Sequence, residues 1–355
     1  MTEVTTTQDS AAIGSLCILR TSAIGDVTHV VPMLRSLQRQ SPGTRITWII
    51  GKLEHRLVGD IEGVEFIVFD KSLGREGFRR VRKALAGRQF DVLLHMQVAL
   101  RANLLSRLVK APLRIGYDRA RSKELHGLFI NCRIAGVANQ HVLDALGSFL
   151  VPLGMHQTGV RWDIPIPQAA HDFAEAHIPS GARTLLISAC SSHRLRNWLP
   201  ERYAAVADHA IGVLGWQVLL CGGPSEFERE VGDAIRARMR HTPIDLIGKD
   251  TLKQQLALLQ RADLVLTPDS GPMHMANAVG TPVLGLHAAT NPERSGPYSS
   301  REWCVNRYAD AARDFLRKPA SKLRWGRKIE RAGVMELITV DDVIERLEAF
   351  ASRLG

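Results

Sequence analysis

The sequence predicts an α/β protein with two domains, each built around a parallel sheet. The chain has 355 residues, about twice the usual size of a single domain. Short apolar runs alternate with segments of helical periodicity, which is typical of strand–helix–strand units. Between Trp162 and Arg183 the alternation gives way to a stretch rich in Pro and Gly, a composition that predicts an interdomain linker.

The first domain is expected at residues 13–165, where each strand is a short apolar run followed by a turn and a helix. Its strands are expected at Ser15–Arg20, Arg45–Ile50, Val64–Phe69, Phe90–His95 and Arg114–Tyr117. Its helices are expected near Asp26–Gln40, Gly77–Ala86, Leu100–Val109 and Gln140–Leu153. The first of these helices should end at Ser41-Pro42-Gly43, because Pro and Gly stop a helix.

The second domain is expected at residues 180–338 and repeats the strand, turn and helix pattern. Its strands are expected at Thr184–Ala189, Trp216–Cys221, Ile244–Ile247, Asp263–Thr267 and Pro282–Leu286. Its helices are expected near Pro200–Leu214, Pro224–Arg240, Leu252–Arg261 and Gly271–Val279. Residues 339–355 should form a last amphipathic helix, capped by Thr339 and packed back on the first domain.

The composition excludes several classes of protein. No apolar run approaches the ~20 residues of a membrane-spanning helix, and the polar Met1–Ala12 lacks the features of a targeting signal. A cytoplasmic protein is therefore expected. The five cysteines lack CxxC spacing, which favours reduced, buried thiols. A formal net charge of +10 favours an anionic partner, which leaves nucleic acid, phosphate-bearing small molecules and an anionic membrane open.

The first strand runs directly into a turn that contains Gly25 and Asp26, at the carboxyl edge of the expected sheet. Gly25 permits a tight turn, and Asp26 stands where the strand gives way to a helix. Two interpretations of Asp26 are open. It is either an acid that caps the first helical turn or a carboxylate that serves as a general base.

The fourth strand of the second domain runs into Asp269-Ser270-Gly271-Pro272-Met273-His274. Ser270 and Gly271 open a helix, and the unpaired amides of a helix start, with its dipole, can bind a phosphate. His274 lies one turn further on and should point toward the same anion, unless it is an ordinary core histidine.

Other charged side chains follow strand ends. Arg194 and Arg196 come after the first strand of the second domain and suit a diphosphate, or are simply solvated. Glu226, after Gly222-Gly223, either accepts from ribose hydroxyls or is a first-turn acid. Arg79, Arg80 and Arg82 belong to a basic cluster at Lys71–Lys83, and a second cluster spans Arg313–Arg331. Either cluster could attract an anionic lipid or remain a solvated surface.

Four segments in this order resemble the ADP-heptose:lipopolysaccharide heptosyltransferases of glycosyltransferase family 9. They are Ser22-x-x-Gly25-Asp26, Gly222-Gly223-x-x-Glu226, Asp269-Ser270-Gly271-x-x-His274 and Thr290-x-Pro292 with Gly296-Pro297. The resemblance implies the GT-B fold, two Rossmann-like domains that face a central cleft, and inverting transfer of a heptose from ADP-heptose to the lipopolysaccharide inner core. It also implies an acceptor-binding first domain and a nucleotide-sugar-binding second domain.

The resemblance assigns a role to each candidate residue. Asp26 is the expected catalytic base, with Ser22, Gly25 and Gln97 beside the acceptor and Arg79, Arg80 and Arg82 attracting its negative charge. The expected nucleotide-sugar residues are Arg194, Arg196, Glu226, Asp269, Ser270, Gly271 and His274. Either Arg194 or Arg196 takes the place of the family's usual lysine. GT-B enzymes of this kind supply positive charge from side chains and helix termini, so no metal or other cofactor is expected.

The expected partners are ADP-heptose and an anionic lipopolysaccharide precursor. The enzyme is expected as a monomer at the cytoplasmic face of the inner membrane. Two alternatives remain at this point: an epimerase or hydrolase of nucleotide sugars, which shares the fold, and a basic nucleic-acid-binding protein. The second lacks an aromatic platform for stacking bases and any recognised module.

Overall fold

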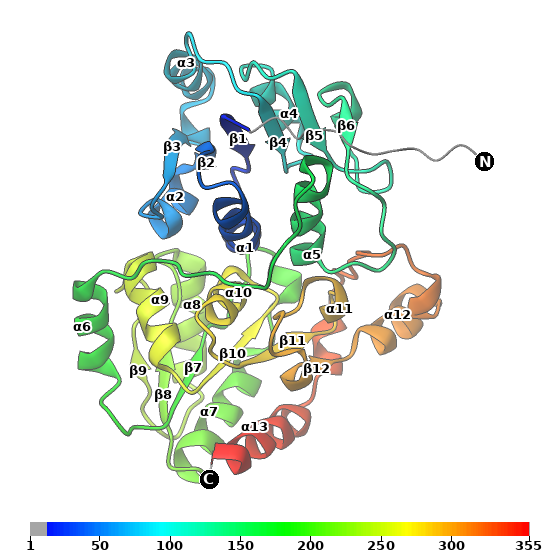
Figure 1. Ribbon diagram of the computed structural model, residues 1–355. Coiled ribbons are helices and arrows are strands. Elements are labelled where there is room, and N and C mark those ends of the chain that lie inside the picture. Colours follow the sequence, from blue (N-terminus) through cyan, green and yellow to red (C-terminus); the bar gives the residue numbers. More distant parts are fainter. Residues whose placement is uncertain (1–12, 355) are drawn as a thin grey trace. The chain divides into compact units, whose positions relative to one another are not determined.

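The computed structural model describes residues 13–354 and divides them into two compact units (Figure 1). Unit 1 runs to Val137 and includes Leu143–Trp162, and unit 2 comprises Ala138–Val142 and the chain from Asp163 onward. Met1–Ala12, on which the expected lack of a targeting signal partly rests, lies outside the described residues.

Unit 1 is a six-stranded sheet in which all strand pairs are parallel, with the order β3-β2-β1-β4-β5-β6. Its strands are β1 (Ser15–Leu19), β2 (Arg45–Gly51), β3 (Val64–Phe69), β4 (Val92–His95), β5 (Leu113–Gly116) and β6 (Cys132–Arg133). Its helices are α1 (Ile24–Gln40), α2 (Lys52–Val58), α3 (Arg75–Ala84), α4 (Leu100–Ser106) and α5 (Val142–Gly147). The central strand β1 is fully buried, as its apolar sequence predicts.

Unit 2 is a second six-stranded parallel sheet, with the order β12-β11-β10-β7-β8-β9. Its strands are β7 (Thr184–Ile187), β8 (Gln217–Leu220), β9 (Ile244–Asp245), β10 (Leu264–Pro268), β11 (Val283–His287) and β12 (Val305–Asn306). Its helices are α6 (Gln168–His177), α7 (Pro200–Gly212), α8 (Glu226–Arg236), α9 (Leu252–Arg261), α10 (Gly271–Ala278), α11 (Pro292–Ser295), α12 (Tyr308–Leu316) and α13 (Val340–Leu354). Counted along each unit, the strand order is the same in both, which confirms the predicted repeat of one architecture.

Short 3-10 helices complete the connections. They are Lys71–Leu73, His126–Leu128, Ser148–Leu153, Arg194–Arg196, Arg301–Trp303, Ala320–Lys322 and Val334–Leu337. The helix expected at Gln140–Leu153 ends in the 3-10 helix Ser148–Leu153. Pro152 lies inside this 3-10 helix and cannot donate a helical hydrogen bond.

The linker predicted between Trp162 and Arg183 is wrong in part, because this stretch contains α6. Helix α6 lies beside α9 in unit 2 (Figure 1). Its buried positions are Ala170 and Ala174, and two alanines do not form the wide apolar stripe that identifies a helix in a sequence. The missed strands β6 and β12 have two residues each and lie at sheet edges, where no periodicity can be recognised.

The last helix lies where the sequence predicts it, but it packs against a different domain from the one expected. The amide of Asp342 donates to Thr339 Oγ1 at 3.1 Å, so Thr339 is the predicted cap. Helix α13 contacts α7, β11 and β12 and buries Val343, Leu347 and Phe350 in the core of unit 2. The expectation that this helix packs back on the first domain is therefore wrong, since an amphipathic pattern predicts that a face is buried but not against which core.

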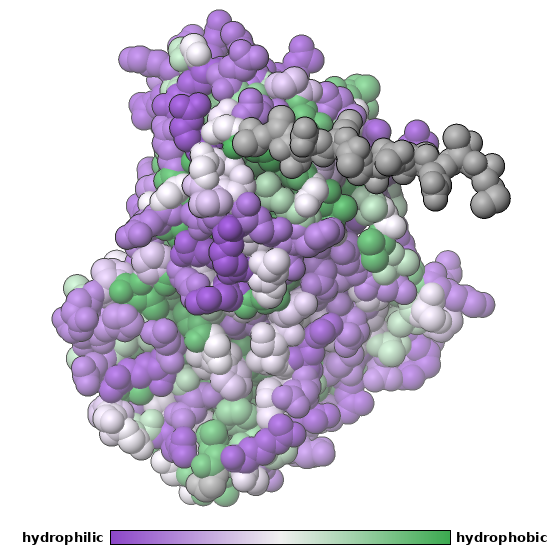
Figure 2. All heavy atoms as spheres, in the orientation of Figure 1, coloured by the Kyte–Doolittle hydropathy of each residue, from purple (hydrophilic) through white to green (hydrophobic). Residues whose placement is uncertain are grey.

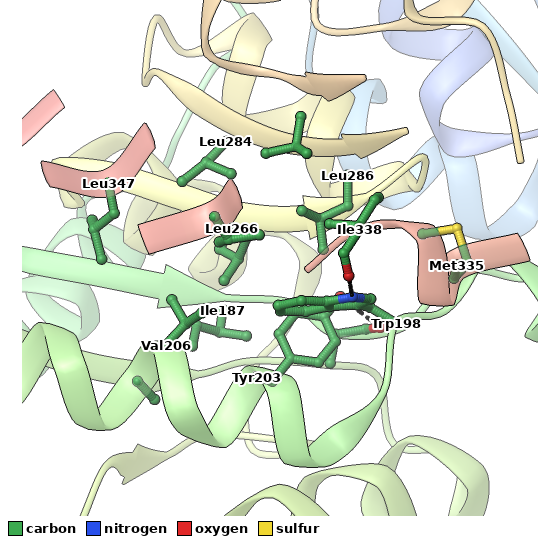
Figure 3. Close-up of a cluster of buried hydrophobic side chains, with 14 of the residues drawn as sticks. Ile187, Trp198, Tyr203, Val206, Leu266, Leu284, Leu286, Met335, Ile338 and Leu347 are labelled. Carbon is green, nitrogen blue, oxygen red and sulfur yellow. Dashed lines mark hydrogen bonds between the residues drawn. The ribbon is translucent and has the colours of Figure 1, made fainter. Parts of the chain in front are cut away.

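Trp198 anchors one loop of unit 2 to that core (Figure 3). Its ring is 2% exposed and makes an edge contact with Tyr203, with ring centroids 5.1 Å apart. Its Nε1 donates to the carbonyl of Ile338 at 3.0 Å. Because Trp198 is fixed in this way, the 3-10 turn Arg194–Arg196 just before it is held at the end of β7.

The visible surface is mostly hydrophilic (Figure 2). Among residues 13–354, no helix combines the length and the apolar composition that crossing a membrane requires. The five cysteines are free, as predicted, although Cys132 and Cys190 are only partly buried.

Candidate active site

In each unit most of the candidate residues follow the two central strands, whose connections lead in opposite directions along the sheet. Ser22, Gly25 and Asp26 follow β1, and Gln97 follows its neighbour β4. In unit 2, Arg194 and Arg196 follow β7 while Asp269 to His274 follow its neighbour β10. Open parallel sheets bind their ligands at such switch points, because the diverging connections leave the carboxyl ends of both strands uncovered.

Gln97 joins the two loops at the switch point of unit 1. Its Oε1 accepts from the amide of Thr21 at 2.8 Å and from Thr21 Oγ1 at 2.9 Å. Its Nε2 donates to Ser22 Oγ at 3.0 Å. Ser22 and Gln97, which the sequence singles out separately, therefore lie in contact.

Asp26 occupies the third position of α1, after Ile24 and the buried Gly25. Its Oδ2 accepts from the amide of Ala23 at 3.3 Å and forms an ion pair with Arg20. The capping interpretation of Asp26 is thus confirmed. Its side chain is still 37% exposed, so the carboxylate remains accessible to a substrate hydroxyl, and its role as a base stays a prediction.

Arg20 is a site residue that the sequence analysis missed. Its side chain is 12% exposed and also donates to the carbonyl of Met96, just before Gln97. Burial disfavours the charged guanidinium, but the Asp26 carboxylate outweighs this and raises the pKa of Arg20. The available signal was an arginine that directly follows a buried apolar strand, where a charge needs a partner.

Arg79, Arg80 and Arg82 do not join this group. They lie on the exposed face of α3, whose buried positions are Gly77 and Val81. Arg80 and Arg79 pair with Glu76 at 3.3 and 3.7 Å. Exposed pairs of this kind contribute little to stability, so the positive face of α3 remains available to an anion.

Arg196, rather than Arg194, reaches the second switch point. Its Nε donates to Glu330 Oε1 at 2.8 Å, and a terminal nitrogen lies 3.7 Å from Asp269 Oδ2. Arg194 is exposed, and its guanidinium lies over the ring of Phe227, 4.1 Å from the ring centroid. The contacts of Arg196 are thus those of a residue at this switch point, and its taking the place of the family's usual lysine stays a prediction.

Asp269 is a buried carboxylate at the end of β10. Burial alone would raise its pKa, but the hydrogen bond from His274 and the charge of Arg196 hold the pKa of Asp269 well below its usual range. His274 Nε2 lies 3.8 Å from Asp269 Oδ1, and the ring is 8% exposed. His274 is thus a buried histidine that faces the candidate site, which combines the two interpretations left open by the sequence.

Ser270 caps α10 through its side chain, at the helix start that the sequence predicts. Its Oγ accepts from the amide of Met273 at 3.5 Å and lies 2.9 Å from Thr267 Oγ1. Gly271 is the first helical residue. The first amides of a helix have no partner within it, and those of Ser270 and Gly271 can therefore donate to a phosphate.

Lys328 and Glu330 were not singled out by the sequence, and they complete this cluster. Glu330 accepts a hydrogen bond from Arg196. The pKa of Lys328 is lowered by partial desolvation and by the positive charge of the neighbouring Arg196. The negative charges of Glu330 and Asp269 act in the opposite direction and favour the charged form of Lys328. The sequence showed both residues only as members of the basic segment Arg313–Arg331.

Glu226 is an exposed residue in the first turn of α8, as one of its two interpretations predicts. Its contact with a ribose stays a prediction. Glu228 is the acid that folds the preceding loop, since it accepts from the amide of Gly223 and from the side chain of Ser225. The signal that could have identified Glu228 is its spacing from Ser225, typical of a capping box.

Among the described residues, no group of three or more His, Cys, Asp or Glu side chains is placed to hold a metal ion. The positive charge at the unit 2 switch point comes instead from Arg196 and Lys328, beside the start of α10. Such an arrangement suits an anionic phosphate group.

Two six-stranded parallel-sheet units, each with candidate residues at its switch point, are the architecture of the GT-B fold. The family model of glycosyltransferase family 9 (heptosyltransferase) matches residues 78–323, and the chain belongs to this family. This membership favours a transferase over the epimerase, hydrolase and nucleic-acid-binding alternatives.

Individual relatives agree with the family. The chain is 40% identical to the lipopolysaccharide core heptosyltransferase OpsX of Haemophilus influenzae, over 94% of this chain and 96% of that protein. A solved family 9 glycosyltransferase of Veillonella parvula has a TM-score of 0.77 at 22% identity, covering 96% and 97% of the two chains. The E. coli heptosyltransferase WaaC, solved with ADP, has a TM-score of 0.70 at 18% identity, covering 95% and 99%.

Proposed function

We propose that this chain transfers a heptose from ADP-heptose to an anionic acceptor of the lipopolysaccharide inner core, with inversion at the sugar carbon. The observation that carries the proposal is the unit 2 cluster, in which two cations and the start of α10 meet at the sheet's switch point. The names of its relatives, a lipopolysaccharide core heptosyltransferase and an enzyme solved with ADP, support the choice of donor and acceptor.

In the proposed reaction, Asp26 takes the proton of an acceptor hydroxyl as its oxygen attacks the anomeric carbon of heptose. The bond between that carbon and the diphosphate breaks, and ADP leaves with the electron pair. Arg20 keeps the Asp26 carboxylate in place through their ion pair. A base placed in this way contributes about two to four orders of magnitude to the rate.

In unit 2, Arg196 and Lys328 offset the negative charge that builds up on the departing diphosphate. The amides of Ser270 and Gly271 donate to the phosphate oxygens, and Asp269 with Glu330 holds Arg196 in position. Charge stabilisation by groups that are already oriented is the main source of catalysis in such transfers. Glu226 is proposed to contact the ribose.

Gly271→Val should weaken ADP binding by roughly ten- to a hundredfold, because the new branched side chain separates the phosphate from amide donors whose charged hydrogen bonds contribute about 1.5–3 kcal/mol each. Calorimetric titration with ADP measures the change. Ala278→Val adds similar bulk at the other end of α10 and should leave the affinity near that of the wild type. Equal affinities for the two variants would place the phosphate site elsewhere.

The acceptor is proposed to be lipid A carrying octulosonic acid, or a core that already bears a heptose. Its phosphates and carboxylates fit the exposed cations Arg79, Arg80 and Arg82 of α3. We also propose that the enzyme works as a monomer at the cytoplasmic face of the inner membrane, where this acceptor is embedded. A cleft between the two units stays a prediction.

Replacing Arg79, Arg80 and Arg82 together with Gln should raise KM for the lipid acceptor at least about tenfold, since each basic residue near an anionic surface contributes about 1 kcal/mol. KM for ADP-heptose should not change, and added salt should mimic the substitution. Steady-state kinetics on each substrate test this. Gln at the exposed Arg238, Arg240 and Arg346 of unit 2 is the control, and a matching rise in acceptor KM there would contradict a specific role for α3.

The release of ADP from ADP-heptose, measured with and without a lipopolysaccharide acceptor, tests the proposed function. We expect release to depend on the acceptor. Equal release without it would identify a hydrolase of the nucleotide sugar and overturn the proposed transfer.

A further inference from the structure

The segment from 100 to 133 in unit 1 concentrates positive charge. It contains eight Lys and Arg residues against two acidic residues, in a chain with a formal net charge of +10. Asp118 is already paired with Arg121, and Glu124 accepts from the amide of Leu100. In the part of the chain that the structure describes, Arg121 is the one of these cations in an ion pair; the other seven form none: Arg101, Arg107, Lys110, Arg114, Arg119, Lys123 and Arg133.

The same segment exposes four leucines. The exposed fractions are 76% for Leu128, 66% for Leu125, 49% for Leu104 and 46% for Leu100. Leu100 and Leu104 are four residues apart on α4 and therefore share one helix face. Hydrophobic residues interrupt the hydrophilic surface of unit 1 near α4 and β6 (Figures 1 and 2). Clustered exposed leucines usually mark an interaction surface.

A buried polar network holds the two leucine pairs together. Asn103 of α4 donates to the carbonyl of Glu124 at 2.7 Å, and its Oδ1 lies 3.0 Å from His126 Nδ1. The amide of Tyr117 donates to His126 Nε2 at 3.2 Å, so His126 carries its proton on Nδ1 and donates it to Asn103. The loop is thus fixed to α4 on both sides of Leu125, at Glu124 and at His126.

The backbone of this loop is strained. Glu124 has φ 49° and Leu125 has φ 62°, in the left-handed region that residues with a Cβ rarely adopt. Strain of this kind persists only where the surroundings enforce it, and it is typical of functional segments. Here the enforced conformation turns a leucine toward solvent, which no requirement of the core explains.

A pocket of about 330 Å³ lies at the edge of the patch, lined by Arg107, Arg114, Leu128, Phe129, Ile130 and Asn131. The Arg114 guanidinium is used internally, since it donates to the carbonyls of Phe129, Val109 and Ser106. Arg107 is exposed and, within the described residues, has no carboxylate partner. The pocket therefore combines an apolar wall with a free positive charge.

We propose that Leu100, Leu104, Leu125 and Leu128, with the surrounding cations, form a docking surface for an anionic phospholipid bilayer. Leucines next to unpaired Arg and Lys are the combination that binds such a surface, because the side chains enter the boundary of the acyl chains while the cations meet phosphates. A second copy of this chain would carry the same excess of positive charge, which opposes self-association through this patch.

The surface also adjoins the proposed active site, and this part of the inference rests on the proposed function. Leu100 begins α4 only three residues after Gln97, which contacts Ser22 in the loop that leads to Asp26. Docking through α4 would therefore place the acceptor loop at the membrane surface, where a lipid-linked acceptor presents its sugars.

Sedimentation with vesicles tests the surface directly. The full chain should bind vesicles of equal parts phosphatidylcholine and phosphatidylglycerol, and bind phosphatidylcholine vesicles much less. Leu125→Ser with Leu128→Ser should weaken partition roughly tenfold through lost apolar burial. Gln at Arg101, Arg107 and Lys123 should weaken it roughly a hundredfold. Val213→Ser, at an exposed position of unit 2, is the control and should sediment like the wild type.

Wild-type sedimentation of both the leucine and the charge variants would overturn the proposal, as would a loss confined to the Arg79, Arg80 and Arg82 variant. A wild-type dimer that the leucine variant dissociates, without vesicle binding, would identify a second copy as the occupant and also overturn it. Heptose transfer to a water-soluble acceptor should be the same in the leucine variant, in the variant of Arg101, Arg107 and Lys123 and in Val213→Ser. If the wild type lacks that activity the proposed function fails, whereas the vesicle result stands independently.

Discussion

Asp26→Asn should lower kcat by about two to four orders of magnitude, the usual contribution of a general base. Asn keeps an oxygen for the amide of Ala23 and caps a helix nearly as well as Asp. It cannot take a proton from the acceptor hydroxyl. ADP affinity should change little, because Asp26 is not among the proposed phosphate contacts. Steady-state kinetics and calorimetry separate the two effects.

The substitution also removes the charge partner of the largely buried Arg20, which should lower the thermal midpoint. Asp310→Asn is a matched control, because Asp310 is also a first-turn acid paired with arginines, on α12, which follows the edge strand β12. Its kcat should equal that of the wild type. Turnover near the wild-type rate in folded Asp26→Asn would reduce Asp26 to a helix cap.

Arg196→Gln should weaken ADP binding by about 1–3 kcal/mol, the range of a hydrogen bond to a charged group, and should lower kcat further. The larger kinetic effect follows because the diphosphate gains negative charge as its bond to the sugar breaks. The substitution also leaves Asp269 and Glu330 without their shared cation, so both carboxylates would repel the leaving group. Calorimetry with ADP and single-turnover kinetics measure the two losses.

Arg194→Gln is the matched control, since Arg194 lies two residues away in the same 3-10 turn and stacks on Phe227 instead. It should retain most of the ADP affinity. Loss of affinity in Arg194→Gln alone would transfer the role of the family's lysine to Arg194.

Strong local signals made much of the fold predictable. The bounds of β3 and α9 match the prediction residue for residue, because each segment has a clear period and a distinct boundary residue. Helix α6 was not predicted because its buried side chains are alanines. The packing of α13 on unit 2 depends on contacts between residues far apart in the sequence, which no local pattern encodes.

The candidate site could likewise be predicted from local sequence signals only in part. The loops after β1, β4, β7 and β10 could be predicted, because parallel strands bring their carboxyl ends to one edge. The participation of Lys328 and Glu330 could not be predicted, since both belong to a segment without regular structure, from which Glu330 reaches Arg196. The difference between Arg194 and Arg196 depends on Trp198, whose burial fixes the turn that carries both arginines.

Incubation with ADP-heptose and a panel of truncated lipopolysaccharide acceptors, analysed by mass spectrometry, tests the central claim most directly. The account predicts that one class of acceptor gains the mass of a single heptose, with one ADP released for each transfer, and that Asp26→Asn nearly abolishes the product. Free heptose formed without any modified acceptor, or a panel in which no acceptor gains mass while ADP-heptose is bound, would contradict the account.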